Sequence, residues 1–178
     1  MYKILANTLF LGKEVVYMPT CHSTNDTTRE LVSHTDKKEG LMVITDAQTQ
    51  GKGQRGNTWS SEHHKNLTFS LLLKPSFLQV NQQFYLNMIS SLAVVETLKN
   101  WIPDKKVQVK WPNDVLVDKK KICGILIENS LTGTKMTNSI VGVGLNVNQV
   151  EWDTPNATSL IHHVQKELEL APILEQVI

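Results

Sequence analysis

The segment 107–148 constrains the fold most, because it contains four strand-like runs joined by short connections. The runs cover 107–111, 115–117, 121–128 and 139–148. Antiparallel neighbours can be joined by a tight turn, whereas parallel neighbours need a crossover of about a dozen residues or more. The segment therefore predicts antiparallel hairpins within one sheet.

Further strands and helices occur along the chain without a regular β-α-β-α alternation. Strands are expected at 14–18, 41–45 and 67–74, and helices at 27–34, after the capping residue types of 23–26, and at 81–100. The stretch 157–178 also has helical spacing, interrupted by Pro172. This order favours an α+β or mixed α/β fold, in which helices cover a largely antiparallel sheet.

The helix expected at 81–100 has one apparent apolar stripe. The stripe consists of residues that recur at steps of three and four, namely Tyr85, Met88, Ile89, Leu92 and Val95. We therefore expect Tyr85 and Met88 in the core and not at a ligand site.

Size and composition indicate one globular domain with no special affinity for nucleic acid. The chain has 178 residues, and 18 Lys+Arg against 17 Asp+Glu leave a net charge of +1, where a dedicated nucleic-acid-binding protein is usually strongly basic. No apolar run approaches the roughly 20 residues of a membrane span, and residues 1–7 lead to no clear cleavage site. Cys21 and Cys123 lie far apart and outside any C-x-x-C pair, so a cytoplasmic protein is expected.

Residues 46–65 read as a long loop with little apolar periodicity, and loops of this length are often functional. The loop contains Gly51-Lys52-Gly53-Gln54-Arg55-Gly56, formally a G-x-G-x-x-G motif. Neither a clear helix nor an acidic residue about 20 positions further on follows it, so a dinucleotide fingerprint is weakly supported. On composition alone, a flexible surface loop remains an alternative interpretation of this segment. Against that interpretation, Lys52 and Arg55 alternate with glycines, which lets cations and N–H groups approach an anion, and Trp59 adds an aromatic face.

Two strand-like runs are joined by the segment Lys110-Trp111-Pro112-Asn113-Asp114. The simplest interpretation of this segment is an ordinary hairpin turn. A second turn, 118–120, ends where Lys121 opens a strand. By period-two alternation this lysine shares a face with Cys123, Ile125 and Ile127. If that face looks inward, the ammonium group of Lys121 projects into a partly enclosed site and needs an anionic partner.

These segments, in this order, resemble the biotin protein ligase family over roughly residues 15–165. The matching residues are Ser23-Thr24-Asn25, Gln48, Gly51 to Gly56, Trp59, Lys110 to Asp114, Lys121 to Glu128, Gly142 to Asn146 and Ala157 to Leu160. The glycine loop alone is weak evidence for the family. The combination of Lys-Trp-Pro-Asn-Asp with the Lys121 segment shortly after it is highly specific for the family.

The resemblance implies an α+β catalytic domain of the class II aminoacyl-tRNA synthetase-like, biotin–lipoyl ligase type. It implies the activity of an ATP-dependent, AMP-forming biotin–[acetyl-CoA-carboxylase] ligase. Biotin and ATP, with Mg²⁺, would form biotinoyl-5′-AMP and pyrophosphate. A lysine of a biotin carboxyl carrier protein domain would then displace AMP.

The resemblance also assigns site residues, with no resident metal among them. The catalytic residues would be Lys121, Lys52, Arg55 and Asp114. Biotin would be bound by Ser23, Thr24, Asn25, Gln48, Gly51, Lys52, Gly53, Gln54, Lys121 and Gly124. ATP or the adenylate would be bound by Lys52, Arg55, Trp59, Lys110, Asn113, Gly142 and Asn146. Lys121 would bridge the biotin carboxylate and the α-phosphate, Asp114 would orient or deprotonate the acceptor lysine, and the glycine loop would close over the intermediate.

The sequence departs from the family pattern in two respects. Lys52 and Gln54 stand where the family commonly has arginine, and lysine lacks the bidentate fork of arginine. We also expect residues 1–178 to be one catalytic domain without an N-terminal winged-helix extension or the usual small C-terminal β-barrel domain. DNA-binding repressor activity is therefore not expected, while the oligomeric state, a homodimer included, stays open.

Two alternatives remain: a lipoyl ligase or transferase of the same general fold, and a non-catalytic biotin-binding fragment. The remaining candidate ligands offer little. The adjacent pairs His63-His64 and His162-His163 would point apart on a strand or helix, which favours ordinary histidines over a metal site. Both cysteines are expected to be inert core residues.

Overall fold

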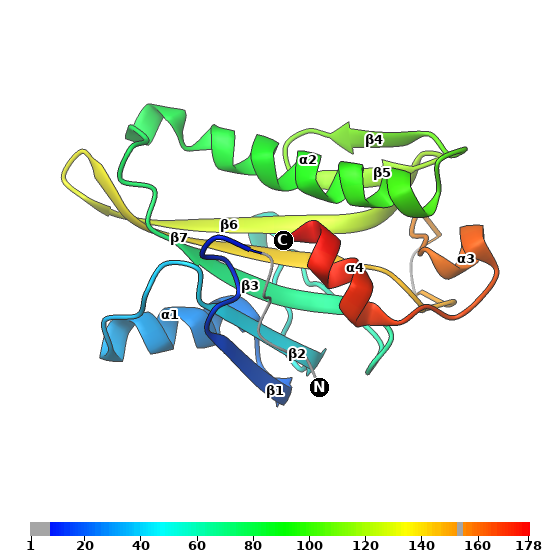
Figure 1. Cartoon of the computed structure of the whole chain (residues 1–178), viewed down its shortest axis with the longest axis horizontal. Coiled ribbons are helices and arrows are strands. Elements are labelled where there is room, and N and C mark those ends of the chain that lie inside the picture. The colour runs from blue at the N-terminus through cyan, green and yellow to red at the C-terminus, as the bar shows by residue number, and fades with distance from the viewer. Residues whose placement is uncertain (1–7, 153–154) are drawn as a thin grey trace.

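A seven-stranded sheet forms the centre of the computed structural model, which describes residues 8–152 and 155–178 (Figure 1). The strands are β1 (Val15–Cys21), β2 (Met42–Gln48), β3 (Leu67–Leu73), β4 (Val107–Lys110), β5 (Asp114–Val117), β6 (Lys120–Thr132) and β7 (Lys135–Leu145). Their order across the sheet is β1-β2-β3-β7-β6-β5-β4. β1 and β2 are parallel, and all other neighbours are antiparallel. The expectation of a mixed, largely antiparallel sheet is confirmed.

The segment 107–148 forms the consecutive antiparallel strands β4 to β7, as its short connections predict. β6 and β7 are longer than expected, since they extend through polar residues to Thr132 and Lys135. A tight turn at Gly133, with φ of 60°, joins them. Glycine adopts this left-handed conformation without the steric cost that a side chain brings.

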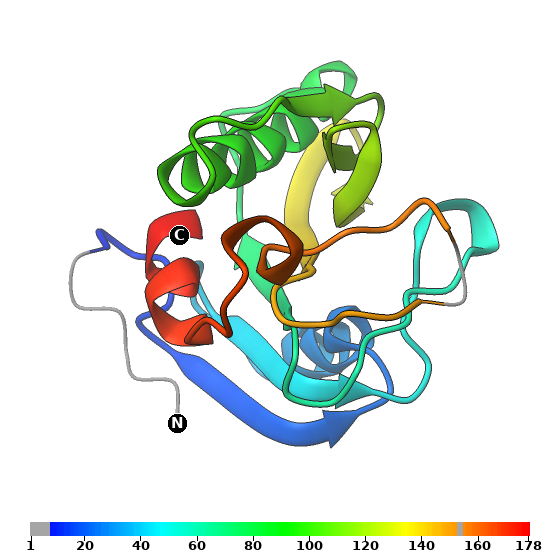
Figure 2. The ribbon, with the colours of Figure 1, turned by 90° about the vertical axis from the view of Figure 1, so that its right-hand side faces the viewer.

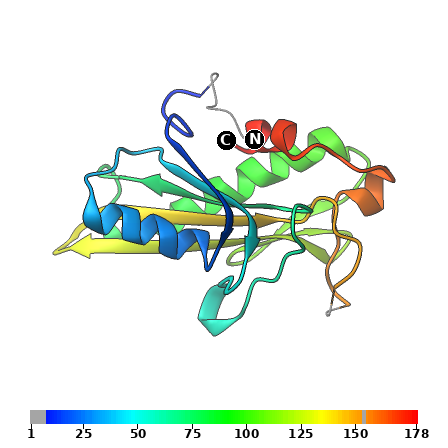
Figure 3. The same cartoon turned by 90° about the horizontal axis from the view of Figure 1, so that it is seen from below.

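The helices are α1 (Thr24–His34), α2 (Phe84–Trp101), α3 (Ile161–Val164) and α4 (Leu170–Val177), with short 3₁₀ turns η1 (Gln54–Gly56) and η2 (Val80–Gln82). Val94 and Leu98 of α2 and Ile173 of α4 are buried in one core with inward side chains of the sheet. Figure 2 shows α2 and α4 together on one side of the curved sheet. In Figure 3 the loop that carries η1 projects from the sheet away from α4. One face thus carries the main core, while α1 covers part of the other face over a smaller buried cluster of Leu41, Leu72 and Ile140.

The stripe predicted for α2 is wrong. The helix buries Leu86, Val94, Val95 and Leu98, of which only Val95 belongs to the predicted stripe. The other members of that stripe are exposed: Tyr85, Met88, Ile89 and Leu92. Apolar residues occur almost all around this helix, so periodicity alone does not identify the face that packs on the sheet.

The break predicted at Pro172 is also misplaced. Pro172 lies in the first turn of α4, where a backbone N–H has no intrahelical partner. The chain instead breaks at Gln165, which follows α3 and has a left-handed φ of 56°. None of the described helices is both long and apolar enough to cross a membrane. Residues 1–7, on which the expectation of no signal peptide rests, lie outside the described residues.

Candidate active site

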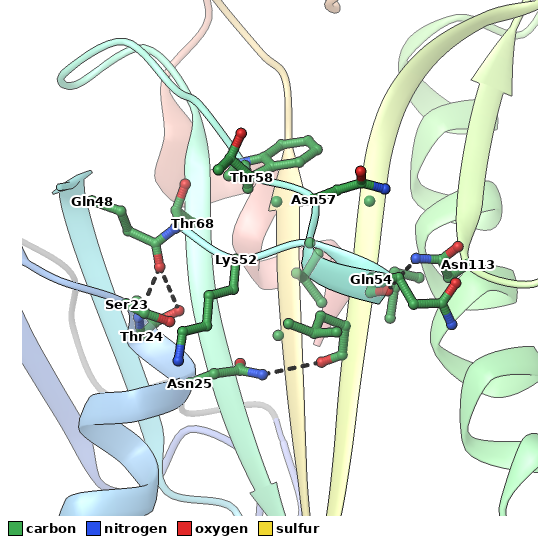
Figure 4. A pocket seen from close by; sticks show the side chains of 18 of the residues that line it. Ser23, Thr24, Asn25, Gln48, Lys52, Gln54, Asn57, Thr58, Thr68 and Asn113 are labelled. Atoms are coloured by element: carbon green, nitrogen blue, oxygen red, sulfur yellow. Dashed lines mark hydrogen bonds between the residues drawn. The ribbon is translucent and has the colours of Figure 1, made fainter. Parts of the chain in front are cut away.

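A cavity of about 280 Å³ lies on the face of the sheet opposite the core, between the start of α1 and the glycine loop (Figure 4). This volume is close to the lower end of the range for small-molecule sites, about 300–1,000 Å³. Most of the predicted site residues line it: Ser23, Thr24, Asn25, Gln48, Lys52, Gly53, Gln54, Arg55, Trp59, Asn113, Asp114, Lys121, Gly124 and Gly142. Segments about 100 residues apart in the sequence therefore converge on one space.

Three glycines make the floor of this cavity accessible. Gly124 of β6 pairs with Gly144 of β7. Gly142 precedes Gly144 by two positions and therefore lies on the same face of the sheet. A Cβ added at Gly142 would lie 2.3 Å from the Asn25 side chain, and one at Gly144 would lie 2.3 Å from the Trp59 ring. Asn25 and Trp59 approach the backbone of the floor so closely that no side chain fits there. Such a close approach is a common reason for glycine inside a strand.

The start of α1 forms a polar end of the cavity. Gln48, the last residue of β2, accepts hydrogen bonds at its side-chain oxygen from the backbone N–H and hydroxyl of Thr24, at 2.7 and 3.2 Å. The buried Ser70 hydroxyl lies 2.7 Å from the Thr24 hydroxyl and 2.6 Å from the amide oxygen of Asn25. Ser23 is the N-cap of α1 but makes no side-chain cap hydrogen bond. Its buried hydroxyl is therefore available to a ligand.

A chain of charged side chains leads from the polar end to the glycine loop. Asn25 donates to Glu128 at 2.7 Å, and Glu128 pairs with Arg29 at 2.5 Å. Arg29 pairs with Asp26, which in turn pairs with Lys52 of the glycine loop, both at 2.6 Å. Burial acts to raise the pKa of Asp26, but the hydrogen bonds from Lys52 and Arg29 outweigh it and lower that pKa.

Lys121 lies in the cavity, but for a different reason than the alternation predicts. β5 and β6 shift register between Val115 and Leu116, so that Leu116 pairs with Lys121 and Val115 with Cys123. This β-bulge inserts Ile122 and reverses the side on which the preceding residue points. A Cβ at Gly124 would lie 3.2 Å from the Lys121 ammonium, whereas Cys123 and Ile125 are in the core. The predicted shared face with Cys123, Ile125 and Ile127 is therefore wrong.

The Lys121 ammonium has an anionic partner, as expected for a lysine in an enclosed place. It lies 2.6 Å from the carboxylate of Asp114, whose side chain is 18% exposed. Asp114 follows the Trp111-Pro112 turn, and the neighbouring Asn113 donates from its amide nitrogen to the Ile125 carbonyl at 3.0 Å. The turn therefore holds two oxygen-bearing side chains at the cavity, which an ordinary hairpin turn does not require.

Trp59 connects the loop to the floor. Its ring lies over Gly144 and Gly124, with the Lys121 ammonium 5.5 Å from the ring centroid. Its indole N–H is buried and has no hydrogen-bond partner among the described residues. A buried polar group without a partner costs about 1–3 kcal/mol, so this arrangement leaves a donor for a molecule that enters the cavity.

The glycine loop is a small irregular hairpin and not a helix start. Lys52 and Thr58 form an isolated antiparallel bridge, and Gly53 donates to the carbonyl of Asn57 at 2.7 Å. Arg55 sits at the tip of the loop, is exposed, and has a left-handed φ of 58°. The loop thus presents its cations at the entrance of the cavity and does not form the phosphate cradle of a dinucleotide fold.

Three predicted residues lie outside the lining. Gly51 is buried beneath the loop, where a Cβ would meet the Trp59 carbonyl at 2.2 Å, and Lys110 is exposed at the end of β4. Asn146 is buried and donates to the Thr158 carbonyl at 3.0 Å, while its amide oxygen has no partner among the described residues. Sequence reasoning missed several lining residues: Asn57, Thr58, Thr68, Ile125, Leu126, Val143 and Gly144. For most of them the strand pattern gives no sign of a ligand face.

The cysteines have the expected inert character. Cys21 and Cys123 are both free and buried. Burial raises the pKa of both thiols, so the reactive thiolate is disfavoured. Cys123 belongs to the core beneath the cavity and not to its lining.

Comparison with known proteins gives a consistent set of relatives. The model of the biotin/lipoate A/B protein ligase family matches residues 17–146. The bifunctional ligase/repressor BirA of Bacillus subtilis is 31% identical over 174 residues, covering 94% of this chain and 52% of that protein. The biotin–protein ligase of Homo sapiens is 34% identical over 152 residues, covering 83% of this chain and 21% of that protein. The chain thus spans about half the length of BirA.

A solved structure extends this similarity to three dimensions. The biotin protein ligase of Aquifex aeolicus in complex with biotin and ATP is 31% identical to this chain, with a TM-score of 0.78. The match covers 93% of this chain and 67% of the other. The similarity in three dimensions therefore extends over most of this chain.

Proposed function

Because the chain belongs to the biotin/lipoate A/B protein ligase family, we propose that it is the catalytic domain of an ATP-dependent biotin–[carrier protein] ligase. The observation that carries the proposal is the position of Lys121. Its ammonium lies at the junction between the polar end of the cavity and the cationic glycine loop, paired with Asp114. A carboxylate and a triphosphate that repel each other would meet at such a junction.

The polar end suits the neutral ureido head of biotin. Its donors and acceptors belong to Ser23, Thr24, Asn25 and Gln48, and the first three are almost fully buried. The apolar side chain of Leu126 in the lining suits the rest of a small molecule that combines a polar head with an apolar body. Thr68 and the backbone of Gly53 complete this end of the site.

The first step joins biotin to AMP. An oxygen of the biotin carboxylate attacks the α-phosphorus of ATP, and the bond to pyrophosphate breaks. Lys121 would bridge the two anions, and Lys52 and Arg55 would lie along the phosphates, where preset cations offset developing charge. Lys52 must leave Asp26 to do so, which couples phosphate binding to a movement of the glycine loop.

The second step transfers biotin to protein. The amine of an acceptor lysine attacks the acyl carbon, the bond to the AMP oxygen breaks, and the amine loses a proton. Asp114 is the carboxylate in the lining that could orient the amine or accept this proton. We propose a biotin carboxyl carrier protein domain as the acceptor, with no role for DNA.

Mg²⁺ fits the oxygen donors that this site offers. The Asp114 carboxylate and the Asn113 amide oxygen line the cavity, and the amide nitrogen of Asn113 is already bonded to the Ile125 carbonyl. Mg²⁺ that enters with ATP would offset the charge of the phosphates. The two buried free cysteines agree with a reducing compartment, and we propose the cytoplasm.

Mass spectrometry for biotinoyl-AMP after incubation with biotin, ATP and Mg²⁺ tests the proposal. We expect the adenylate with wild-type protein and a loss of about 100-fold or more in Lys121→Met, because an oriented charge at the reacting groups is removed. Lys119→Met is the matched control, since Lys119 is exposed in the preceding turn. Normal adenylate formation in Lys121→Met would refute the role of Lys121.

The same assay separates the alternatives. Lipoyl-AMP formed in place of biotinoyl-AMP would identify a lipoyl ligase. Biotin binding by calorimetry without any adenylate would identify a non-catalytic binding domain. A carrier domain added to the reaction then tests whether its lysine is biotinylated.

A further inference from the structure

The foot of the glycine loop carries a group of side chains that the ligase reaction does not use. Sequence reasoning expects His63 and His64 to point apart, but their ring centroids lie 3.9 Å from each other in a T-shaped arrangement. The cause is the backbone of His64, which has a left-handed φ of 59°. This conformation turns two successive side chains to the same side, which neither a strand nor a helix would do.

A buried carboxylate completes this group. Asp46 of β2 is 6% exposed, and its Oδ2 lies 3.2 Å from Nδ1 of His64. One nitrogen from each histidine and a carboxylate oxygen of Asp46 all lie within 4.8 Å of one another. Imidazole nitrogen and carboxylate oxygen are the ligands, at about 2.0–2.2 Å, that zinc accepts in proteins. Both histidines are exposed, so their side chains are free to adjust toward a common ion.

Neighbouring groups hold the carboxylate in place. The Tyr17 hydroxyl donates to Oδ2 of Asp46, and the His64 backbone N–H donates to the Asp46 carbonyl at 3.2 Å. Both side-chain contacts use Oδ2, and no hydrogen bond among the described residues reaches Oδ1. Partners of this kind orient a ligating carboxylate in metal sites.

The local charge favours a cation. Across residues 8–152 and 155–178, Asp46 has no ion pair with lysine or arginine, in contrast to Asp26 and Asp114. Lys65, which directly follows His64 in the sequence, is paired with Glu167 at 2.9 Å. Asp46 is thus accompanied by Tyr17 and His64 and by no cationic lysine or arginine among the described residues, and both histidines are exposed to solvent and to an incoming ion.

We propose that Asp46, His63 and His64 form a binding site for a divalent transition-metal ion of the zinc class. Three protein ligands would leave a further coordination position to water. Asp46 precedes the glycine loop and the histidines follow it, so a bound ion would join the two ends of residues 47–62. The site is independent of the proposed ligase function, and ligase activity is not needed to detect it.

Metal titration of the tag-free protein tests the site. We expect one Zn²⁺ per chain by calorimetry, and visible absorption from Co²⁺ bound to nitrogen and oxygen ligands. His63→Ala, His64→Asn and Asp46→Asn should each weaken binding by about tenfold or more. Asparagine at position 64 tolerates the left-handed backbone, so this variant separates ligand loss from backbone strain.

The second histidine pair provides the matched control. His162 and His163 are also adjacent, but they belong to no group of three potential ligands among the described residues. The variant with both replaced by alanine should bind Zn²⁺ as the wild type does. Absence of one-to-one binding, unchanged affinity in His63→Ala and His64→Asn, or an equal loss in the His162 and His163 variant would each overturn the proposal. If Asp46→Asn does not fold, the two histidine variants still decide the outcome.

Discussion

The two ends of the cavity are built on different principles. At the polar end, Thr24, Asn25 and Ser70 are buried and bonded to one another, with distances of 2.6 to 2.7 Å to the Ser70 hydroxyl. At the loop end, the cations are partly exposed and paired with carboxylates of the same protein, Lys52 with Asp26 and Lys121 with Asp114. One end is fixed by neutral hydrogen bonds, and the other by ion pairs that a ligand can replace.

This difference indicates how the site would bind the two unlike ligands of the proposed reaction. A small neutral head group gains most from donors and acceptors that are already in place, because little order has to be imposed on binding. A polyphosphate brings its own charge, so it can exchange places with internal carboxylates as the glycine loop moves. The polar end should therefore be sensitive to any loss of contact, and the loop end should tolerate change.

Asn25→Ala should have the largest effect on the fixed end. The substitution removes the hydrogen bond from Asn25 to Glu128 and the one that Ser70 donates to Asn25, which should reduce the free energy of unfolding by about 3 kcal/mol. Biotin affinity measured by calorimetry should fall with it. Ser33→Ala, on the exposed side of the same helix, is the control for urea unfolding. Equal stability of the two variants would contradict the idea of a fixed polar end.

Two glycines in the floor of the cavity, Gly142 and Gly144, allow its two ends to be compared by the same substitution with alanine. Gly142→Ala places a methyl group 2.3 Å from Asn25, which is bonded on both sides and has no room to move. We expect a loss of about 2 kcal/mol from overpacking. Gly144→Ala instead meets the Trp59 ring at 2.3 Å, and a side chain on a loop can shift, so about 1 kcal/mol or less is expected. Urea unfolding of both variants gives the comparison directly, and a larger loss in Gly144→Ala would reverse it.

The sequence predicts the order of the sheet better than the faces of its elements. Short connections determine that β4 to β7 are antiparallel, because no other pairing can be closed by tight turns. The inserted Ile122 is invisible to a period-two pattern, yet it decides that Lys121 faces the cavity. The face of α2 was not predictable because its apolar residues surround the helix.

In the candidate site, too, the sequence predicts some lining residues and gives no sign of others. Ser23 to Asn25, Gln48 and Lys121 were found through family motifs, since each motif lies in a recognisable local context. Gly144 and Thr68 lie within apolar strand patterns that describe the core and not the opposite face. The contact between His63 and His64 depends on one left-handed φ angle, which the sequence does not indicate for histidine.

A comparison of two tryptophans, Trp59 at the loop end of the cavity and Trp101 in α2, tests the loop end through a smaller effect. Trp59→Phe keeps a ring over the glycine floor and removes an N–H that has no partner among the described residues. Trp101→Phe removes an N–H that donates to Gln176 at 3.0 Å. We expect a change near zero for the first variant and a loss of about 1 kcal/mol for the second, by urea unfolding. A clear loss in Trp59→Phe alone would mean that the loop end is as firmly fixed as the polar end.

A small loss of stability should also follow when the ion pair that holds the loop is removed. Burial acts to raise the pKa of Asp26, but Lys52 and Arg29 lower it overall, so the folded state favours the carboxylate. This stability is present above the unfolded pKa of about 3.9 and is lost as the pH falls through the lower folded value. Because Lys52 is 48% exposed, solvent screening limits the contribution to about 0.5 kcal/mol.

Asp26→Asn should therefore be slightly less stable than wild type at pH 6, and the difference should be smaller at pH 3, below the unfolded pKa of about 3.9. Asp36→Asn is the control, because Asp36 is 97% exposed in its pair with Lys74 and should behave as wild type at both pH values. A difference that persists unchanged at pH 3 would exclude the ion pair as its cause. If the difference is small at pH 6 and decreases at pH 3, the ion pair is its cause and holds Lys52 only weakly, so a phosphate group can replace the carboxylate at little cost.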